Sequence, residues 1–324
     1  MKNTNWKKII IIVVVVLLCL TVVKDFLIKT TITTVGSAVL GAPIKIGYFS
    51  LGLFTQGVAI NNLKVYNPPG FPKEIMINAP QIRVKYDLWK LFQGKIRLPL
   101  IVFNLKEMIV IKNKEGKLNV DALKVVEEQK SKTEKKKEGS KPAKEMALEI
   151  DLLKLNVERV VLKDFTKGEP FGVYSYEIAL KNKEFRNIKS VEQMATLIMV
   201  QAMGPTAIQG AGVYAAATVL GVGFLPAGIV GALVAKDSET AEFSASVGKT
   251  YEIALNLIKK MGEVKSEDKT TGIVKGKVDV ADVTVKVEKN EKRKTQVTVS
   301  ARQLVLPKPE IAAGIIYQLK QKIR

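Results

Sequence analysis

The chain has 324 residues, of which 51 are basic and 31 are acidic, with no histidine and a single cysteine, Cys19. It therefore lacks the commonest zinc ligands, cannot build a Ser-His or Cys-His nucleophile pair, and cannot form an internal disulfide. The net charge of +20 is compatible with nucleic-acid binding, but lysines recur at alternate positions of strand-like runs, which is typical of solvated faces. We expect no catalytic residues, no metal, no cofactor and no nucleic-acid partner.

The most apolar stretch of the chain is Ile9–Val23, which reads IIIIVVVVLLCLTVV between flanking lysines. Its 15 residues are fewer than the roughly 20 that a spanning helix needs, and Trp6 and the lysine stems could extend it. The pattern predicts an uncleaved transmembrane helix with a cytoplasmic N-terminus. A cleaved signal peptide is disfavoured because no small-residue cleavage site follows the run, and a buried soluble helix is the third alternative.

A β-rich region is predicted after a helix over Phe26–Ala42 that ends near Gly41 and Pro43, so residues 1–42 form the anchor and juxtamembrane helix. Residues 43–205 form the next domain. A helical turn is expected at Leu88–Phe92 and a helix capped by Asn119 at residues 119–129. Alternating polar and apolar residues predict strands at Ile44–Tyr48, Val58–Tyr66, Ile75–Asp87, Lys95–Leu98, Ile101–Asn104, Met108–Lys112, Val157–Phe165 and Val173–Leu180.

Two segments of unusual composition interrupt this pattern. Residues 129–145 are rich in lysine and contain no large apolar side chain, which predicts an exposed linker or a headgroup-contacting loop. Residues 206–238 are rich in glycine and alanine, after a predicted helix at Ser190–Met203. For Ile208–Ala235 three alternatives remain open: a second membrane crossing, a re-entrant or surface-lying hairpin, or a buried helix pair.

A second domain is predicted over residues 239–324. Val247–Met261 is an amphipathic helix ended by Gly262, and Glu310–Ile323 is a closing helix. The order α-β-β-β-α predicts helices packed on one face of an antiparallel sheet. Its three strands are expected at Gly272–Val278, Val280–Glu288 and Lys294–Ala301.

The first part of the chain, from about Lys7 to Val126, resembles the N-terminal module of AsmA-like proteins. The resemblance is carried by the apolar run, the turn Asn67-Pro68-Pro69-Gly70-Phe71, the segment DLWKLFQGKI at residues 87–96 and the turn Gly116–Asn119. It implies a bacterial envelope protein, single-pass in the inner membrane with its bulk in the periplasm. Relatives are associated with phospholipid movement and outer-membrane assembly, and no catalytic residues come with the family. The tail from Glu239 is similar to a small α/β domain of unknown function found in bacterial lipoproteins.

The predicted fold class is therefore α+β: an N-terminal transmembrane helix, a curved antiparallel β-rich groove domain and a small α-β-β-β-α domain. A sheet with few covering helices must close on itself, find a partner or bind an apolar ligand. We expect a non-enzymatic protein that binds or transfers phospholipid or aids outer-membrane assembly; the alternative is a structural protein that docks envelope partners without carrying lipid. The candidate groove residues are the apolar members of the predicted strands, Ile60, Ile82, Val84, Ile101, Phe103, Ile109 and Ile111.

Overall fold

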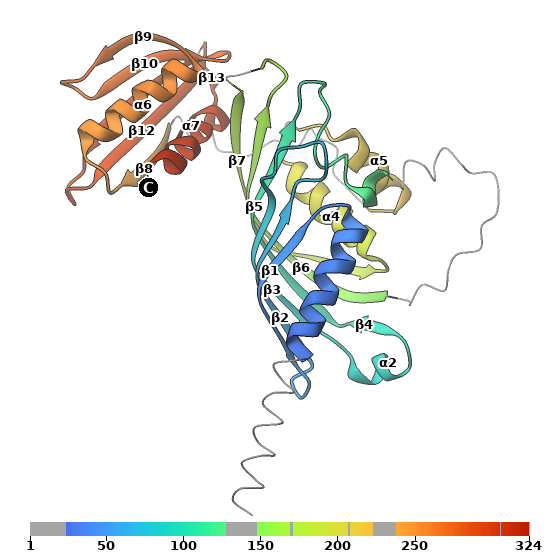
Figure 1. Ribbon diagram of the computed structural model, residues 1–324. Helices are drawn as coiled ribbons and strands as arrows, with labels where there is room; N and C mark the ends of the chain where they lie inside the picture. The colour runs from blue at the N-terminus through green and yellow to red at the C-terminus, as the bar shows by residue number, and fades with distance from the viewer. Residues whose placement is uncertain are drawn as a thin grey trace, which may run out of the picture. The chain divides into compact units, whose positions relative to one another are not determined.

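The computed structural model describes residues 24–127, 148–168, 171–206, 208–222, 238–304 and 306–323 (Figure 1). They form an α+β protein with two β-sheets. The described residues group into two compact units. The first lies within Met1–Leu105, Lys137–Asn156 and Lys181–Val191, and the second within Lys106–Lys136, Val157–Leu180 and Glu192–Arg324. The predicted linker at 129–145 lies outside the described residues.

The larger sheet is mixed, which corrects the predicted antiparallel sheet. Its strand order is β1-β2-β3-β5-β6-β4, with β7 also paired to β6. The pairs β1–β2 and β2–β3 are antiparallel, whereas the short β4 runs parallel to β6, with Ile96 beside Leu148. The strands are β1 Ile44–Gly52, β2 Gly57–Tyr66, β3 Ile75–Lys85, β4 Ile96–Leu98, β5 Leu100–Lys112, β6 Leu148–Asp164 and β7 Gly172–Ile188.

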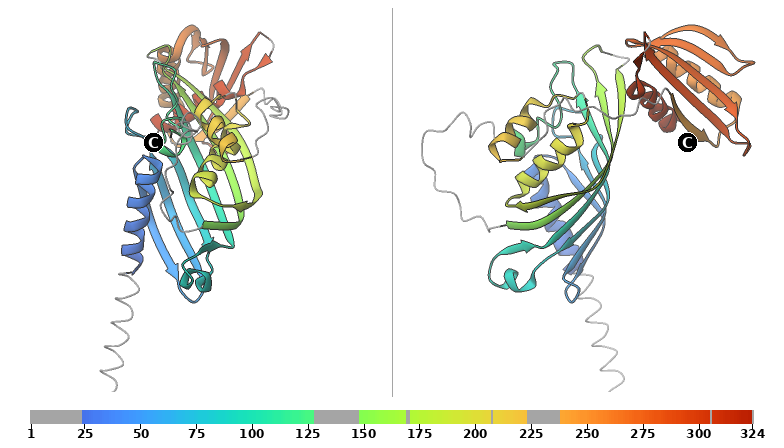
Figure 2. Two further views of the ribbon diagram at one scale, coloured as in Figure 1. Left: turned by 90° about the vertical axis from the view of Figure 1, so that its right-hand side faces the viewer. Right: turned by 180° about the vertical axis from the view of Figure 1, so that it is seen from behind.

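A helix over residues 24–40 runs beside the outer edge of β1 (Figure 2). Lys24 Nζ donates to the Leu51 carbonyl at 2.6 Å, and the Leu51 N–H donates to Asp25 Oδ1 at 3.1 Å. Further along, the Ile44 N–H donates to Ser37 Oγ at 2.9 Å. Side chains of the helix thus occupy backbone groups that an unprotected edge strand would offer to another chain.

The predicted membrane crossing is corrected by the described helices, none of which has both the length and the apolar character that a span requires. The helix at 24–40 carries Lys24, Asp25, Lys29 and four threonines, so it is too polar for the role. This finding contradicts the N-terminal transmembrane helix of the predicted fold class and the predicted single-pass location in the inner membrane. The run Ile9–Val23 itself lies outside the described residues.

The glycine- and alanine-rich segment contributes one short helix to the second unit. Helix α5, Ala211–Val219, follows α4, Val191–Met203. Its 9 residues rise only about 14 Å, well short of a hydrocarbon core of about 30 Å. Val213, Ala216 and Ala217 are buried, so this part of the segment packs as a core helix, while residues 223–235 lie outside the described part of the chain.

Asn119 does not cap a helix as predicted. The helical residues begin only at 124, and Asn119 is fully buried against β5. Its Oδ1 accepts from the Ile111 N–H and its Nδ2 donates to the Ile109 carbonyl, both at 2.9 Å. The amide therefore satisfies two backbone groups of a strand, which a buried polar side chain must do to remain stable in the interior.

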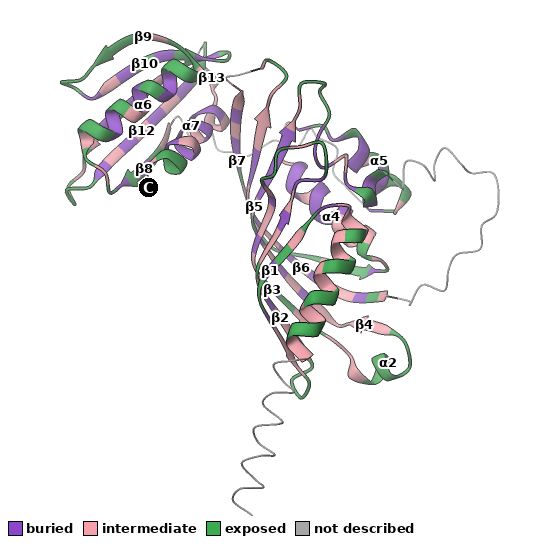
Figure 3. Ribbon diagram, in the orientation of Figure 1, coloured by how far each residue is buried: buried purple, intermediate pink, exposed green. Residues whose placement is uncertain are grey.

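The second sheet belongs to residues 238–307 and is covered by two helices, α6 (Val247–Met261) and α7 (Pro309–Lys322). Burial alternates strictly along β11, where Val283, Val285 and Val287 are buried. Figure 3 shows buried segments on both the strands and the helices of this region. Both predicted helices and all three predicted strands are present. The predicted α-β-β-β-α order lacks two strands, however. The observed sheet has six strands and also contains β8 and β9, which lie toward opposite edges of it. The strands are β8 Ser238–Phe243, β9 Gly262–Asp268, β10 Ile273–Val278, β11 Ala281–Lys289, β12 Thr295–Gln303 and β13 Leu306–Pro307.

Candidate functional site

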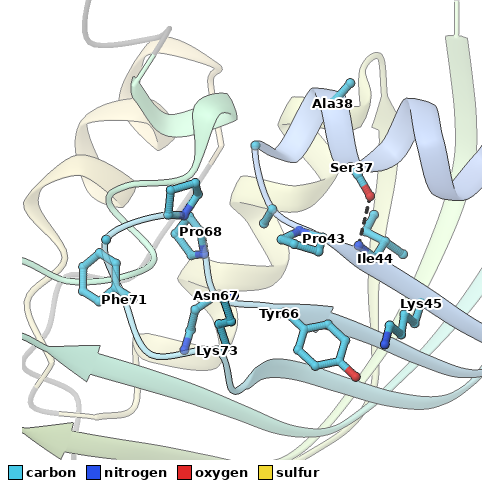
Figure 4. A pocket seen from close by; sticks show the side chains of 14 residues that line it. Ser37, Ala38, Pro43, Ile44, Lys45, Tyr66, Asn67, Pro68, Phe71 and Lys73 are labelled. Atoms are coloured by element: carbon cyan, nitrogen blue, oxygen red, sulfur yellow. Dashed lines mark hydrogen bonds between the residues drawn. The ribbon is translucent and has the colours of Figure 1, made fainter.

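A cavity of about 870 Å³ lies in the first unit where three segments meet. They are the end of the helix at 24–40, the start of β1 and the turn between β2 and β3 (Figure 4). We call this the helix-end cavity. Its lining residues are Ser37, Ala38, Gly41, Ala42, Pro43, Ile44, Lys45, Tyr66, Asn67, Pro68, Pro69, Gly70, Phe71 and Lys73.

One wall of the cavity is formed by the C-terminal end of the helix at 24–40 and the start of β1. Gly41 adopts a φ of 68°, a left-handed conformation that glycine accepts at no steric cost and that commonly ends a helix. The Gly41 N–H donates to the Ser37 carbonyl at 2.9 Å, while the Ser37 hydroxyl accepts from the Ile44 N–H. The Tyr66 N–H then donates to the Pro43 carbonyl at 2.8 Å. These bonds join the helix end, β1 and the end of β2 around the cavity.

The other wall is the proline-rich turn between β2 and β3. Hydrogen bonds of Asn67, which is only 6% exposed, stabilise this turn. Asn67 Nδ2 donates to the Pro72 carbonyl at 2.8 Å, and its backbone N–H donates to the Glu74 carbonyl at 3.0 Å. Gly70 has a φ of 89°, which a residue with a side chain would rarely adopt. Because prolines fix their own backbone angles, the turn presents a preformed apolar surface. Phe71 and Pro68 lie on that surface (Figure 4).

The lining is apolar apart from two lysines and a few neutral polar groups, and it contains no carboxylate. Lys45 Nζ lies 5.2 Å from the centre of the Tyr66 ring, close enough for a cation–π contact. Lys45 also lies directly opposite Lys64 in the β1–β2 register. The two charged side chains of the lining, Lys45 and Lys73, are both positive, an arrangement suited to a ligand with an apolar part and an acidic part.

The predicted groove residues do not line this cavity. In the first unit, Ile60 and Ile82 face each other in the β2–β3 register, and Val84 lies opposite Val58. Ile60 and Ile82 are buried, as are Ile101 and Phe103 on β5, whereas Val84 is half-buried. The structure therefore brings the first-unit members together on neighbouring strands, where all but Val84 are interior side chains. Val84 lines a separate cavity of about 320 Å³.

Ile109 and Ile111 belong to the second unit, and both are buried where Asn119 bonds to their backbone. Sequence reasoning missed the lining of the helix-end cavity, although its turn, Asn67–Phe71, is one of the motifs that carry the family resemblance. The sequence feature that could have indicated this cavity is the high proportion of proline and glycine beside Phe71 and Lys73.

A second cavity, of about 510 Å³, lies within the second unit and carries charged groups of both signs. Asp279 accepts from Lys167 Nζ at 2.7 Å and from the Tyr174 hydroxyl at 2.9 Å. Burial works to raise the pKa of Asp279, but these hydrogen bonds outweigh it and lower that pKa. Lys112 Nζ lies 3.7 Å from Asp164. These carboxylates already have cationic partners, so they offer neither a general base nor a vacant cation site.

Metal and acid–base chemistry find little support among the described residues. They contain no group of three or more cysteine, aspartate or glutamate side chains placed to hold a metal ion. Glu107 has its pKa raised by burial, with Arg159 acting in the opposite direction. Arg159 Nε lies 3.3 Å from the Glu107 carboxylate. That pair forms a structural contact within the second unit rather than a reactive centre.

Comparison with known proteins adds no assignment: no protein-family model, curated protein or solved structure matches this chain. The resemblance of Lys7–Val126 to AsmA-like proteins therefore stays a prediction. The helix-end cavity is the feature on which a functional argument can be built.

Proposed function

We propose that this protein is a non-enzymatic envelope protein that binds an amphipathic, phospholipid-like molecule in the helix-end cavity. The observation that carries the proposal is an apolar hollow with two lysines and no carboxylate in its lining. Its volume of about 870 Å³ falls in the range of about 300–1,000 Å³ that is usual for small-molecule sites.

The apolar part of the ligand is expected to lie against the proline-rich turn. Phe71 is half-buried and Pro68 is buried, and both line the cavity together with Ile44 (Figure 4). Contact with an acyl chain would remove these surfaces from water, which is favourable in proportion to the apolar area covered. Because the walls are preformed, little ordering entropy opposes binding.

The acidic part of the ligand is expected to lie near Lys45 and Lys73. The described lining of the cavity contains no carboxylate that would compete with a phosphate for these two ammonium groups. Lys45 keeps its position beside the Tyr66 ring. Two lysines and one ring can orient a headgroup without any bond being made or broken, which is why we propose binding or transfer rather than catalysis.

The proposal is tested with the full chain and a phospholipid that carries a photoactivatable group on its acyl chain. After irradiation, mass spectrometry locates the modified peptides, and we expect adducts in residues 37–45 and 66–73. Phe71→Asp places a carboxylate in the cavity and should reduce labelling about tenfold or more. Phe185→Asp changes a similarly half-buried phenylalanine outside the cavity lining and serves as the matched control.

Labelling spread evenly over the chain, or labelling that Phe71→Asp leaves unchanged, would contradict a lipid site in this cavity. If the purified protein carries no lipid and crosslinking in cells gives specific protein adducts, the alternative of a structural protein that docks partners without carrying lipid would be favoured.

A further inference from the structure

One end of the first unit exposes large apolar side chains that its core does not use. We call Leu53, Phe54, Trp89, Leu91 and Phe92 the tip cluster. Phe54 is fully exposed, Trp89 is 71% exposed and Phe92 is 76% exposed. Single exposed apolar residues are ordinary, but five of them on two adjoining segments call for an explanation.

Hydrogen bonds hold the two segments together. Leu53 and Phe54 belong to the β1–β2 hairpin, and the others belong to α2, Leu88–Phe92. The N–H groups of Tyr86 and Leu88 donate to the backbone oxygen and the side-chain Oε1 of Gln56, at 3.1 and 3.3 Å. The Tyr86 hydroxyl donates to the Gly52 carbonyl at 3.1 Å. Hairpin and helix lie at the same end of the unit in both views of Figure 2.

Helix α2 has no fully buried residue, and Trp89, Leu91 and Phe92 contribute little to packing. A single helical turn is unstable by itself, and here the Asp87 side chain accepts from the Lys90 N–H at 3.0 Å and fixes the first turn. At the other end, the Gln93 N–H donates to the Trp89 and Lys90 carbonyls. The chain thus holds Trp89 and Phe92 in place while leaving them in water.

Basic residues surround the tip cluster. The segment Lys85–Arg97 contains four basic side chains and one acidic side chain, Asp87. Asp87 is already used in capping α2 and lies 3.9 Å from Arg97. Lys95 is exposed and Lys90 is half-buried. The surroundings of the aromatic side chains are therefore positively charged.

The most apolar segment of the sequence joins the described chain at this same end. The run Ile9–Val23 is followed at once by Lys24. Lys24 Nζ bonds to the Leu51 carbonyl, two residues before Leu53. The tip cluster therefore lies near Lys24, the residue that follows this run in the sequence. The helix-end cavity lies at the other end of the helix at 24–40, roughly 20 Å away.

We propose that the tip cluster is a docking surface for the face of a lipid bilayer that contains acidic lipids. Trp89, Phe54 and Phe92 enter the headgroup layer, where aromatic rings are favoured, and Lys90 and Lys95 lie against lipid phosphates. The side chains project from a hairpin and a one-turn helix instead of lining a groove, which suits a fluid surface. The contact involves one leaflet and no crossing, and it goes beyond ligand binding in the cavity.

Trp89 provides a local readout in the full chain. The sequence has two tryptophans, so Trp6→Phe leaves Trp89 as the sole one. With vesicles of phosphatidylcholine and phosphatidylglycerol, we expect its emission to shift to the blue and to be quenched by lipids brominated on the acyl chain. Adding Phe54→Ser and Phe92→Ser should raise the lipid concentration for half-maximal quenching by about tenfold or more. Leu304→Ser, at a 91% exposed leucine in the second unit, should change nothing.

Charge is tested in the same assay by Lys90→Gln together with Lys95→Gln, which should weaken quenching with acidic vesicles but not with phosphatidylcholine alone. Protein that sediments with vesicles while Trp89 keeps its water-exposed emission would overturn the proposal. A blue shift that depends on protein concentration and needs no lipid would also overturn it, because it would assign the surface to a second copy of the chain.

Discussion

The C-terminal sheet and the first unit use their apolar side chains in different ways. In the C-terminal sheet, alternate residues of β11 and β12 point into one core, which α6 and α7 cover. In the first unit, some apolar groups line an open cavity, and others, such as Trp89 and Phe92, stand in water at the tip.

This contrast separates residues that fold the chain from residues that are available for binding. Burial explains the central strands β10, β11 and β12 of the C-terminal sheet, since their valines gain stability by leaving water. Burial does not explain a rigid proline-rich cavity wall or an α2 without a buried residue. The predictions below change one side of this contrast at a time, beginning with the largest expected effect.

Val285→Asp should unfold the C-terminal sheet. Val285 is fully buried on the central strand β11, and an unpaired carboxylate there is expected to cost more than about 4 kcal/mol. Hydrogen exchange of peptides from β11 and β12 measures the loss of structure directly. Val280→Asp, at a valine that is 45% exposed, is the matched control and should leave exchange unchanged. If Val285→Asp also abolished lipid labelling in the helix-end cavity, the separation of folding and binding residues would fail.

Asn119→Leu should destabilise the second unit by about 3 kcal/mol, because it leaves backbone groups of Ile109 and Ile111 without partners in the interior. Thermal unfolding of the full chain gives the change in stability. Asn113→Leu removes an exposed bond to the Lys117 N–H and should cost less than about 1 kcal/mol. Equal losses from the two variants would show that Asn119 does not brace β5.

Periodicity predicted the helices and central strands of the C-terminal domain well, and it did not predict the helix-end cavity. The helix Val247–Met261 was placed at its observed bounds because its apolar stripe and its stop at Gly262 agree. Strands β8 and β9 were missed because polar residues dominate their sequences, SETAEF and GEVKSED. These strands pair with their neighbours through backbone hydrogen bonds, which do not require alternating polar and apolar residues in the sequence.

The helix-end cavity was missed for a different reason. Alternation tells which face of a strand is apolar, so it selected Ile60 and Ile82, which lie in the interior. The cavity instead forms where a helix end meets a turn that lies about 30 residues further along the chain. Nothing in the local pattern brings Pro43 beside Tyr66; their hydrogen bond is a product of the fold.

Lys45→Gln combined with Lys73→Gln should weaken binding of an acidic phospholipid about tenfold, or about 1.4 kcal/mol. Binding of a zwitterionic lipid with the same acyl chains should change much less, because the apolar walls are untouched. Titration with a fluorescent lipid measures both affinities. Lys106→Gln with Lys117→Gln removes two exposed lysines outside the cavity and controls for net charge. A uniform loss for both lipids would mean that the lysines support the fold rather than the headgroup.

Asp268→Asn should have the smallest effect, confined to the turn between β9 and β10. Hydrogen bonds from Thr271 and Thr270 lower the pKa of Asp268 below its ordinary value of 3.8. The charged carboxylate therefore stabilises the folded state at pH values above 3.8. This stabilisation is lost as the pH falls through the lowered pKa of Asp268 in the folded state. Urea unfolding should separate the wild type from Asp268→Asn at about pH 6 and bring them together below about pH 3. A gap that stayed constant across this range would show that the turn depends on the acceptor oxygen alone and not on its charge.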